Sequence, residues 1–548
     1  MADMASAIFY ARAEGLVMTG DFNGCLAALA PAARNIFDNL LTSADSNRQI
    51  SSLRFEVEQG RFPPFLPDLF RAELAVARVK ASGQPTVGSI AHLTINPTLE
   101  LLPVSWANLE QKLTDPAAPI QSAPGTFIMI WRPPGSADVQ IRQADVAHLL
   151  ALKILAEGLR PEAVAAQEGI SIGALDAALQ QAMEEGLILR PPSTILRPQS
   201  FAPGSEVDPQ FLRAKVFTLQ WHITQACDLH CRHCYDRTKR GDLPLAKAMS
   251  ILDKFRGFCR DRFVHGQVTF TGGNPLLYPH FRELYQGAVA RYLGVAILGN
   301  PAPRHQIEEL ISIAKPLFYQ VSLEGLAEHN DFIRGPGHFA RVLDFLALLK
   351  ELGVYSMVML TLTRANQEQV LPLAEILRDK VDLFTFTRLA AVGEGAKLQG
   401  PEIESYPRFL QKFHEAAQHN PCLGFKDNLF NLQASAEGRE PFGGCTGHGC
   451  GAAFNFIALL ADGEVHACRK FPSPIGNAFS ERLATVYDSE RAEAYRQGCA
   501  ACQGCRIRPV CGGCQAVAHG LGLDPLQTRD PYCWLKRDEH PPPTLSCE

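Results

Sequence analysis

Three cysteines lie close together in the segment CDLHCRHCYDRTKRG, which begins at residue 227. They are Cys227, Cys231 and Cys234, and the next cysteine, Cys259, is far along the chain. Closely spaced thiolates are the ligands that zinc and iron–sulfur clusters prefer. A [4Fe–4S] cluster normally takes four cysteines. Three cysteines therefore predict a cluster with one iron left open to bind a small molecule.

Zinc is the alternative at this loop, with His230 or His233 as a fourth ligand. Both histidines lie inside the loop, where the backbone must curl around the bound group. This position disfavours zinc, and the iron–sulfur interpretation is preferred.

A second group of cysteines occupies the C-terminal part of the chain. Ten of the sixteen cysteines lie between residues 422 and 533. We interpret Cys422 and the scattered Cys25, Cys259 and Cys547 as ordinary thiols. The nine that remain exceed the needs of one cluster and suit two clusters with four ligands each. Two all-cysteine zinc sites are the alternative.

The elements that must position the first loop are strands alternating with amphipathic helices, starting near residue 214. The expected strands are 215–224, 267–273, 294–300, 318–325, 354–363 and 383–390. Alternation of this kind is typical of a parallel sheet. We predict an α/β fold with a partial (β/α)6 TIM-like barrel over residues 214–400. Chemistry in such barrels sits at the C-terminal ends of the strands, and the three-cysteine loop follows the first strand.

Two further domains are expected before the barrel. Residues 1–95 read as a helical domain, and 96–195 as a winged helix in which Ser171 caps the recognition helix. The segment GTFIMIWRPPGSADVQIRQAD predicts a hairpin that turns at PPGS. No Lys or Arg occurs between residues 161 and 188, so DNA binding is disfavoured. Binding of a peptide at the hairpin edge is preferred to a purely structural role.

The remaining segments complete the expected organisation. Five prolines between residues 191 and 209 indicate a linker over 196–213. Residues 401–440 are a bridging segment, and 441–548 form a Cys-rich iron–sulfur domain. The net charge of −5, the lack of a basic N-terminal signal and the lack of a long apolar run predict a cytoplasmic protein without nucleic-acid or membrane partners.

The three-cysteine spacing, followed by Tyr235, resembles the signature of the radical S-adenosylmethionine (radical SAM) enzymes. The resemblance implies that the open iron binds S-adenosylmethionine. An electron from the cluster would cleave this cofactor to methionine and a 5′-deoxyadenosyl radical, which removes a hydrogen atom from the substrate.

The same resemblance suggests further cofactor contacts. TGGNPLL resembles the Gly-Gly-Glu loop that holds the amino group of the cofactor, with Asn274 in place of the glutamate, so that an uncharged amide oxygen would accept from that group. VSLEG resembles the Ser-Leu-Asp-Gly segment of the family. The expected contacts are Tyr235, Gly272, Gly273, Asn274, Ser322, Arg341, Thr361 and Leu389.

The C-terminal array resembles the SPASM extension of peptide-modifying radical enzymes, and the resemblance covers about residues 214–540. It implies two auxiliary [4Fe–4S] clusters and three clusters in all. The implied ligands are Cys445, Cys450, Cys468 and Cys514 for the first, and Cys502, Cys505, Cys511 and Cys533 for the second. The gap between Cys511 and Cys514 is one residue short of the usual pattern, and Cys499 is an extra thiol that could replace Cys502.

These resemblances imply a maturase of a ribosomally synthesised peptide, with its leader held by the winged helix and electrons supplied by a flavodoxin or ferredoxin. The thio(seleno)oxazole, or selenobiotic, maturases are the subgroup that the motifs resemble, which implies a Cys or selenocysteine in the peptide. A formylglycine-generating sulfatase maturase is an alternative, but Arg469 stands where those enzymes have a catalytic aspartate. An iron–sulfur electron carrier or regulator without radical chemistry is an alternative of a different class.

Overall fold

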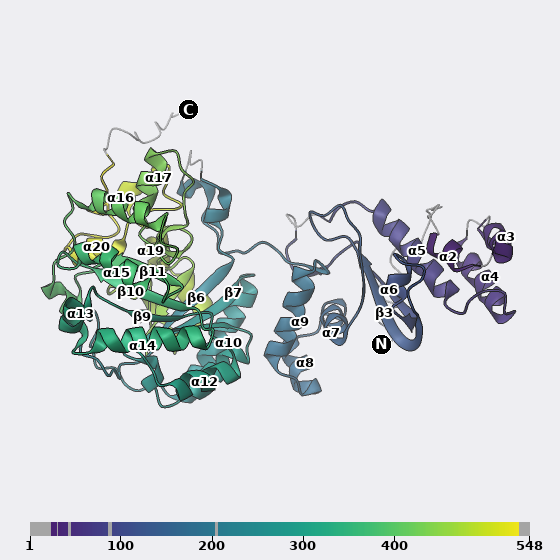
Figure 1. Cartoon of the computed structure of the whole chain (residues 1–548), viewed down its shortest axis with the longest axis horizontal. Coiled ribbons are helices and arrows are strands. Elements are labelled where there is room, and N and C mark those ends of the chain that lie inside the picture. Colours follow the sequence, from purple (N-terminus) through teal and green to yellow (C-terminus); the bar gives the residue numbers. More distant parts are fainter. Residues whose placement is uncertain (1–22, 30, 42–44, 86–89, 203–206, 536–548) are drawn as a thin grey trace. The chain divides into compact units, whose positions relative to one another are not determined.

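A computed structural model describes residues 23–29, 31–41, 45–85, 90–202 and 207–535 (Figure 1). The first 22 residues of the expected helical domain, Pro203 of the expected linker, and Cys547 lie outside these ranges. The chain divides once into compact units, between Pro192 and Ser193. The expected boundaries near residues 95, 213, 400 and 440 therefore fall inside these two units and stay predictions.

The N-terminal unit combines helices with a small antiparallel sheet in the order β2-β3-β4 and a two-stranded pair, β1 with β5. Its helices are α2 (Asn23–Ala28), α3 (Pro31–Leu40), α4 (Ser46–Glu58), α5 (Leu66–Ala81), α6 (Leu109–Lys112), α7 (Val146–Ala156), α8 (Pro161–Glu168) and α9 (Ile172–Glu184). Its strands are β1 (Thr94–Ile95), β2 (Glu100–Ala107), β3 (Gln121–Trp131), β4 (Gln140–Gln143) and β5 (Ile188–Leu189).

One sheet contributes to the two larger hydrophobic clusters of this unit, because side chains alternate along a strand. Ile128 and Ile130 of β3 pack with α5 residues such as Phe70. The intervening Met129 and Trp131 pack on the opposite face with the core residues contributed by α7 and α9. The expected helical and winged-helix segments therefore share a sheet.

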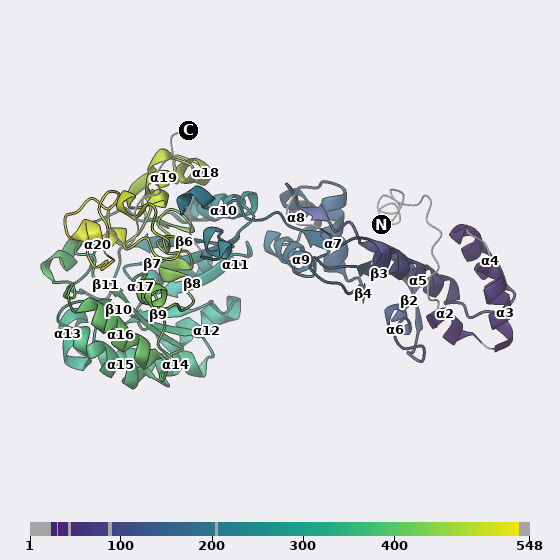
Figure 2. The same cartoon turned by 90° about the horizontal axis from the view of Figure 1, so that it is seen from above.

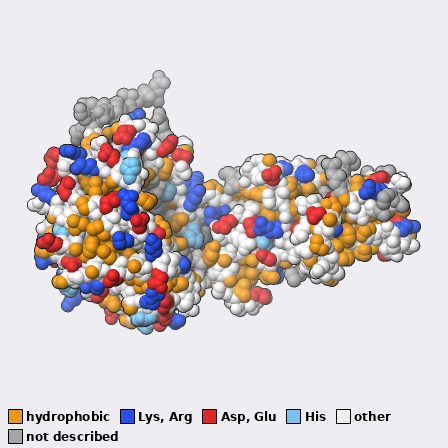
Figure 3. Space-filling model, viewed as in Figure 1, with side chains coloured by type: hydrophobic (Ala, Val, Ile, Leu, Met, Phe, Trp, Pro, Cys, Tyr) orange, Lys and Arg blue, Asp and Glu red, His pale blue; other side chains and the backbone are white. Residues whose placement is uncertain are grey.

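Two local features expected of the winged-helix segment are present, while the assignment as a winged helix stays a prediction. Strands β3 and β4 pair antiparallel, with the PPGS segment between them. The hydroxyl of Ser171 accepts a hydrogen bond of 3.1 Å from the Ala174 N–H and so caps α9. On the face drawn in Figure 3, acidic and basic side chains are interspersed.

The C-terminal unit contains the predicted parallel sheet. Strands β6 to β11 pair parallel in sequence order, and helices lie along the outside of the sheet (Figures 1 and 2). The strands are β6 (Val216–Thr224), β7 (His265–Gly272), β8 (Gly294–Leu298), β9 (Tyr319–Ser322), β10 (Ser356–Leu362) and β11 (Leu383–Arg388). The helices are α10 (Leu245–Asp261), α11 (Phe281–Val289), α12 (Arg304–Ile313), α13 (Ala327–Arg334), α14 (His338–Glu351), α15 (Val370–Leu377), α16 (Tyr406–Ala417) and α17 (Phe430–Ala436).

The Cys-rich segment continues the same sheet. Strand β12 (Phe456–Leu459) pairs parallel with β6, and β13 (Glu464–His466) and β14 (Pro474–Asn477) follow it antiparallel. The helices of this segment are α18 (Leu483–Tyr487), α19 (Glu490–Gln497) and α20 (Gln515–Gly520). The nine-stranded sheet thus joins the barrel and the Cys-rich segment in one compact unit.

Part of the expected linker packs into the C-terminal unit. Arg197 is 5% exposed and donates to the carbonyl oxygens of His448 (2.7 Å) and Cys450 (2.5 Å). Its guanidinium also stacks on the rings of Phe201 and Phe454. Proline spacing could not show this, because the partners lie some 250 residues away in the chain.

Candidate functional site

The three-cysteine loop begins where β6 ends and occupies the C-terminal edge of the parallel sheet. Cys227 is exposed, while Cys231 and Cys234 are half-buried. Burial, and then the charges of Glu324, Cys227 and Cys234, raise the pKa of the Cys231 thiol, although Arg334 opposes this shift. Cys227 and Cys234 are thus close enough to Cys231 to affect its pKa. The donor set fits a metal cluster that prefers soft ligands, and binding would release the thiol protons.

The predicted glycines lie against the stem of this loop. A Cβ atom on Gly272 would lie 2.2 Å from the Thr224 carbonyl oxygen, and one on Gly273 would lie 2.2 Å from that of Ala226. The N–H groups of Gly273 and Asn274 donate to those same two oxygens. The glycines therefore let two loops approach backbone to backbone, which explains their residue type.

We expect Gly273→Ala to disturb the cysteine loop, since the new methyl group meets backbone that cannot rotate away. Overpacking of this kind typically lowers the free energy of unfolding by about 1–3 kcal/mol. Iron per chain after anaerobic reconstitution should fall by about four, one cluster's content. Gly241→Ala, later in the same loop with open space around the new Cβ, is the matched control and should keep full iron. Full iron in both variants would contradict this role of Gly273.

Asn274 is buried and turned toward the loop. Its Nδ2 donates to Asp228 Oδ1 at 3.0 Å, and Nδ2 of Asn300 donates to the same oxygen at 2.6 Å. Nδ2 of Asn300 also lies 3.7 Å from Cys227 Sγ. Asn300 was missed by sequence reasoning, although it follows β8 at the same edge of the sheet.

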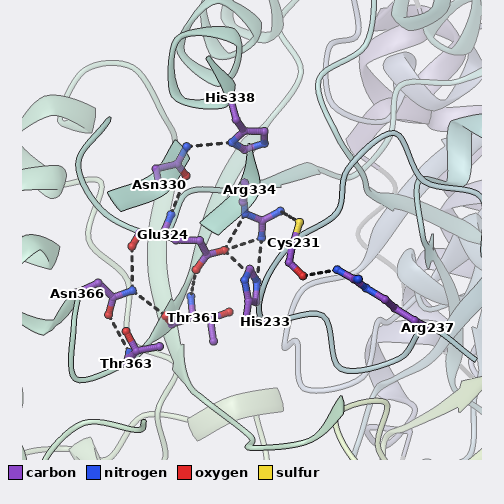
Figure 4. Close-up of polar contacts among 10 residues, drawn as sticks. All are labelled: Cys231, His233, Arg237, Glu324, Asn330, Arg334, His338, Thr361, Thr363 and Asn366. Carbon is purple, nitrogen blue, oxygen red and sulfur yellow. Dashed lines mark hydrogen bonds and ion pairs between the residues drawn. The ribbon is translucent and has the colours of Figure 1, made fainter. Parts of the chain in front are cut away.

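Glu324, which replaces the aspartate of the family segment, is the centre of a buried polar network (Figure 4). Its Oε1 accepts from Arg334 Nε at 2.9 Å and lies 3.3 Å from His233 Nε2. Its Oε2 accepts from the Thr361 N–H at 2.9 Å. Burial favours a raised pKa for Glu324, but the charges of His233 and Arg334 outweigh it and lower the pKa. The carboxylate thus ties the loop to the ends of β9 and β10.

The other predicted cofactor contacts differ in their exposure and in their distance along the chain from the three-cysteine loop. Ser322 ends β9 and is half-buried, and the backbone of Leu389 pairs with that of Leu362 after β11. Tyr235 belongs to the loop itself, and its hydroxyl lies 3.0 Å from His222 Nε2. Arg341 is exposed on α14 and donates to the Pro336 carbonyl oxygen. The arginine of the VSLEG-to-Arg341 segment that does reach the cysteines is Arg334, at the end of α13.

Four C-terminal cysteines face the interior of the barrel. A cavity of about 260 Å³ is lined on the barrel side by Thr218, Gln220, Gln267, Thr269 and Gln320, and on the other side by Cys445, Cys450, Cys468 and Cys514. Burial, followed by the charge of Cys514, raises the pKa of Cys450 to about 12, and Cys468 and Cys445 contribute to the shift. The four thiols predicted to hold the first auxiliary cluster therefore lie together.

The other predicted set lines a second, smaller cavity of about 40 Å³. Cys502, Cys505, Cys511 and Cys533 all contribute to its wall. Cys499 is not in that wall but hydrogen-bonds to Cys502, and this bond is the main cause that lowers the pKa of Cys499 to about 7. Among the described residues, no three His, Cys, Asp or Glu side chains are grouped as ligands of a single metal ion. The ligand sets stay predictions, and their chemistry suits clusters with thiolate ligands.

Comparison with known proteins finds family matches for two segments of this unit. Residues 221–377 match the radical SAM superfamily, and residues 450–515 match the iron–sulfur cluster-binding domain called SPASM. The chain contains a radical SAM domain and a SPASM domain. The fold agrees, since the radical SAM match spans β6 to α15 of the parallel sheet.

Two curated relatives of the chain are named for biosynthesis and for maturation. The antilisterial bacteriocin subtilosin biosynthesis protein AlbA of Bacillus subtilis is 24% identical, over 58% of this chain and 71% of AlbA. The mycofactocin maturase MftC of Mycobacterium tuberculosis is 28% identical, over 58% of this chain and 82% of MftC. A crystal structure of Streptococcus suis SuiB bound to the precursor peptide SuiA is 16% identical, over 75% of this chain and 96% of SuiB, with a TM-score of 0.49.

The radical SAM loop and the SPASM domain are in direct contact. Arg240, which follows the three cysteines, donates to Asp462 Oδ2 at 2.6 Å in the turn between β12 and β13. The guanidinium of Arg469, next to Cys468, lies over the ring of Tyr235 at 5.9 Å. Segments beside the two candidate metal sites therefore contact each other directly.

Proposed function

We propose that this radical SAM protein is an enzyme that oxidatively modifies a ribosomally synthesised precursor peptide. The observation that carries the proposal is the single cavity that joins the polar interior of the barrel to four SPASM cysteines. A substrate in this cavity would lie against the barrel wall and beside the auxiliary site at the same time. The relatives named for bacteriocin biosynthesis and for maturation support a peptide product.

The residues of the chain would divide the work. Cys227, Cys231 and Cys234 would hold the first cluster. When bound, that cluster and S-adenosylmethionine supply a 5′-deoxyadenosyl radical that removes hydrogen. The amide side chains of Gln220 and Gln267 in the cavity wall can donate to and accept from the backbone of an extended peptide. The two SPASM sets, with four cysteines each, would carry away the electron left on the substrate, which completes a two-electron oxidation.

The N-terminal unit would hold the leader of the peptide. In the described residues, β4 pairs with β3 alone and forms one edge of the sheet. Such an edge can accept a further strand from an extended peptide. We also propose a cytoplasmic setting, with a flavodoxin or ferredoxin as electron donor. No helix in the described ranges is both long and apolar enough to span a bilayer.

The test uses the full chain, reconstituted anaerobically, with S-adenosylmethionine, dithionite and the small peptide encoded beside the gene. We expect 5′-deoxyadenosine together with a peptide that has lost a pair of hydrogens, both detected by mass spectrometry. A Cys- or selenocysteine-containing core is the substrate class that the thio(seleno)oxazole resemblance suggests. The appearance of formylglycine would instead favour the sulfatase-maturase alternative.

Absence of 5′-deoxyadenosine from protein with full iron content would overturn the proposal and favour an electron carrier. Formation of 5′-deoxyadenosine without any change in the peptide would show that the substrate class is wrong. Iron, sulfide and zinc are measured on the same preparation. About twelve irons correspond to three clusters, whereas about four irons plus zinc would make the SPASM array a structural metal site.

A further inference from the structure

A buried arginine points at one of the three loop cysteines. Arg334 is the last residue of α13, and its NH1 lies 3.7 Å from Cys231 Sγ. The side chain is 11% exposed. Figure 4 shows its guanidinium between the carboxylate of Glu324 and the sulfur of Cys231. In the described part of the site, this contact brings a full positive charge to a predicted metal ligand.

The guanidinium is held in place by its other nitrogens. Nε and NH2 both donate to Glu324 Oε1, at 2.9 and 2.5 Å. The carboxylate cannot turn away, because its second oxygen accepts from the Thr361 N–H. Asn330 and Asn366 fix the backbone of Glu324, through its N–H and its carbonyl oxygen. The ion pair therefore orients NH1 toward the sulfur.

The cysteine loop is fastened to the same helix end. The Arg232 N–H donates to the Ile333 carbonyl oxygen at 2.9 Å, and the Arg232 side chain donates to that of Phe332 at 2.9 Å. At the other side, Arg237 donates to the Cys231 carbonyl oxygen at 2.7 Å. Cys231 is thus fixed at its backbone from one side and at its sulfur from the other.

If the ion pair only stabilised the fold, the bonds from Nε and NH2 of Arg334 to Glu324 would be sufficient. The third nitrogen, directed at a thiolate, has a chemical consequence that packing does not require. Hydrogen bonds and charge near the sulfurs of an iron–sulfur cluster are among the factors that set its reduction potential. A cation stabilises the reduced cluster, which carries one more negative charge, and so raises the potential. An anion has the opposite effect.

We propose that Arg334 is a positioning residue that donates a charged hydrogen bond to Cys231 Sγ and raises the reduction potential of the cluster on the three-cysteine loop, while Glu324 orients Arg334 and moderates its charge. The inference rests on the proposed function, because it requires that cluster. It goes further in assigning the electrostatic control of electron entry to a pair that contains no metal ligand.

The test is a potentiometric titration of the full-length reconstituted protein, followed by electron paramagnetic resonance. The signal that changes on adding S-adenosylmethionine identifies the first cluster. We expect Arg334→Gln to reduce the ratio of reduced to oxidised cluster about tenfold at a fixed potential, a downward shift of about 59 mV for one electron. Arg334→Lys keeps the charge but loses the planar donor. Its reduction potential should lie between those of Arg334→Gln and the wild type.

Glu324→Gln gives the decisive comparison, because it keeps an acceptor for Arg334 but removes the negative charge. We expect its potential to rise. A purely structural network would instead weaken the cluster in both variants, with shifts of the same sign or lower iron content. Arg304→Gln, which removes an exposed arginine paired with Glu308 and Glu351, is the matched control and should not shift the potential.

Equal potentials in wild type and Arg334→Gln, at equal iron content, would overturn the inference and leave the proposed function intact. Shifts of the same sign in Arg334→Gln and Glu324→Gln would also overturn it. If Arg334→Gln does not assemble a cluster, Glu324→Gln decides alone, and a potential that stays or falls counts against the inference. A wild-type protein without any signal that responds to S-adenosylmethionine would instead refute the proposed function.

Discussion

Cys227→Ala is expected to abolish the formation of 5′-deoxyadenosine, whereas Cys505→Ala is expected to leave that reaction intact and to stop modification of the peptide. Cys227 belongs to the loop at the edge of the barrel, and Cys505 lines the smaller cavity of the SPASM domain. Mutation of a residue that only hydrogen-bonds to a metal ligand already lowers metal affinity or activity about 10–100-fold. Loss of the ligand Cys227 should therefore lower 5′-deoxyadenosine formation by more than about 100-fold.

The measurement is single-turnover analysis of 5′-deoxyadenosine and peptide mass, with iron per chain determined on the same samples. Each variant should lose about four irons, one cluster's content. Cys422→Ala is the control, since this buried thiol lies outside both cavities and contacts the Ala374 carbonyl oxygen. Equal loss of 5′-deoxyadenosine in the Cys227 and Cys505 variants would contradict the division of labour between the two domains.

Much of the barrel could be predicted because its signals are local. The six strands occur in the expected order, and each is a short β-rich run followed by a helical pattern. Strand β6 also shows why the barrel contains a polar cavity. Phe217 and Leu219 are buried in the core, whereas Thr218 and Gln220 line the cavity. This alternation is visible in the sequence and could have predicted a hydrophilic barrel interior.

The contacts that join distant segments could not be predicted in the same way. Arg341 and Arg334 lie seven residues apart in one motif, and only the end of α13 decides which of them reaches Cys231. The pairing of β12 with β6 joins strands more than 200 residues apart. The resemblance to the SPASM extension, and not cysteine spacing alone, suggested the two sets of thiols, and each set lines one cavity.

A third such contact, Arg388 with two aspartates, connects the barrel to both SPASM cavities. Its Nε donates to Asp427 Oδ2 at 2.7 Å, and NH1 and NH2 donate to Asp530 at 2.8 and 2.7 Å. The three side chains are at most 5% exposed. Burial favours a lower pKa for Arg388, but the charges of Asp427 and Asp530 raise it well above its ordinary value. The arginine therefore stays charged.

Asp530 reaches a ligand of each predicted auxiliary cluster. Its Oδ2 accepts from the Cys514 N–H at 2.8 Å, and its carbonyl oxygen accepts from the Cys533 N–H at 2.9 Å. Cys514 lines the larger cavity and Cys533 the smaller one. A substitution at Arg388 should therefore disturb Cys514 and Cys533 through Asp530, although Arg388 is not a predicted metal ligand.

Arg388→Met is expected to destabilise the SPASM domain strongly, because it leaves two buried carboxylates without their counter-charge. Breaking a buried ion pair from one side typically costs about 3–5 kcal/mol. The variant should lose about eight irons and keep the signal of the first cluster. Iron content, paramagnetic resonance and the urea concentration at half-unfolding measure these effects. Arg378→Met, which removes a half-buried arginine paired with Glu375, should change none of them.

A further variant separates charge from hydrogen bonding. Replacing Asp427 and Asp530 by asparagine in the Arg388→Met background removes the unpaired charges but keeps an acceptor near Cys514. If buried charge causes the instability, this triple variant should regain most of the lost resistance to urea. Arg388→Met with full iron and unchanged resistance to urea would show that the barrel holds the SPASM domain by other contacts. The parallel pairing of β12 with β6 would then be the next contact to test.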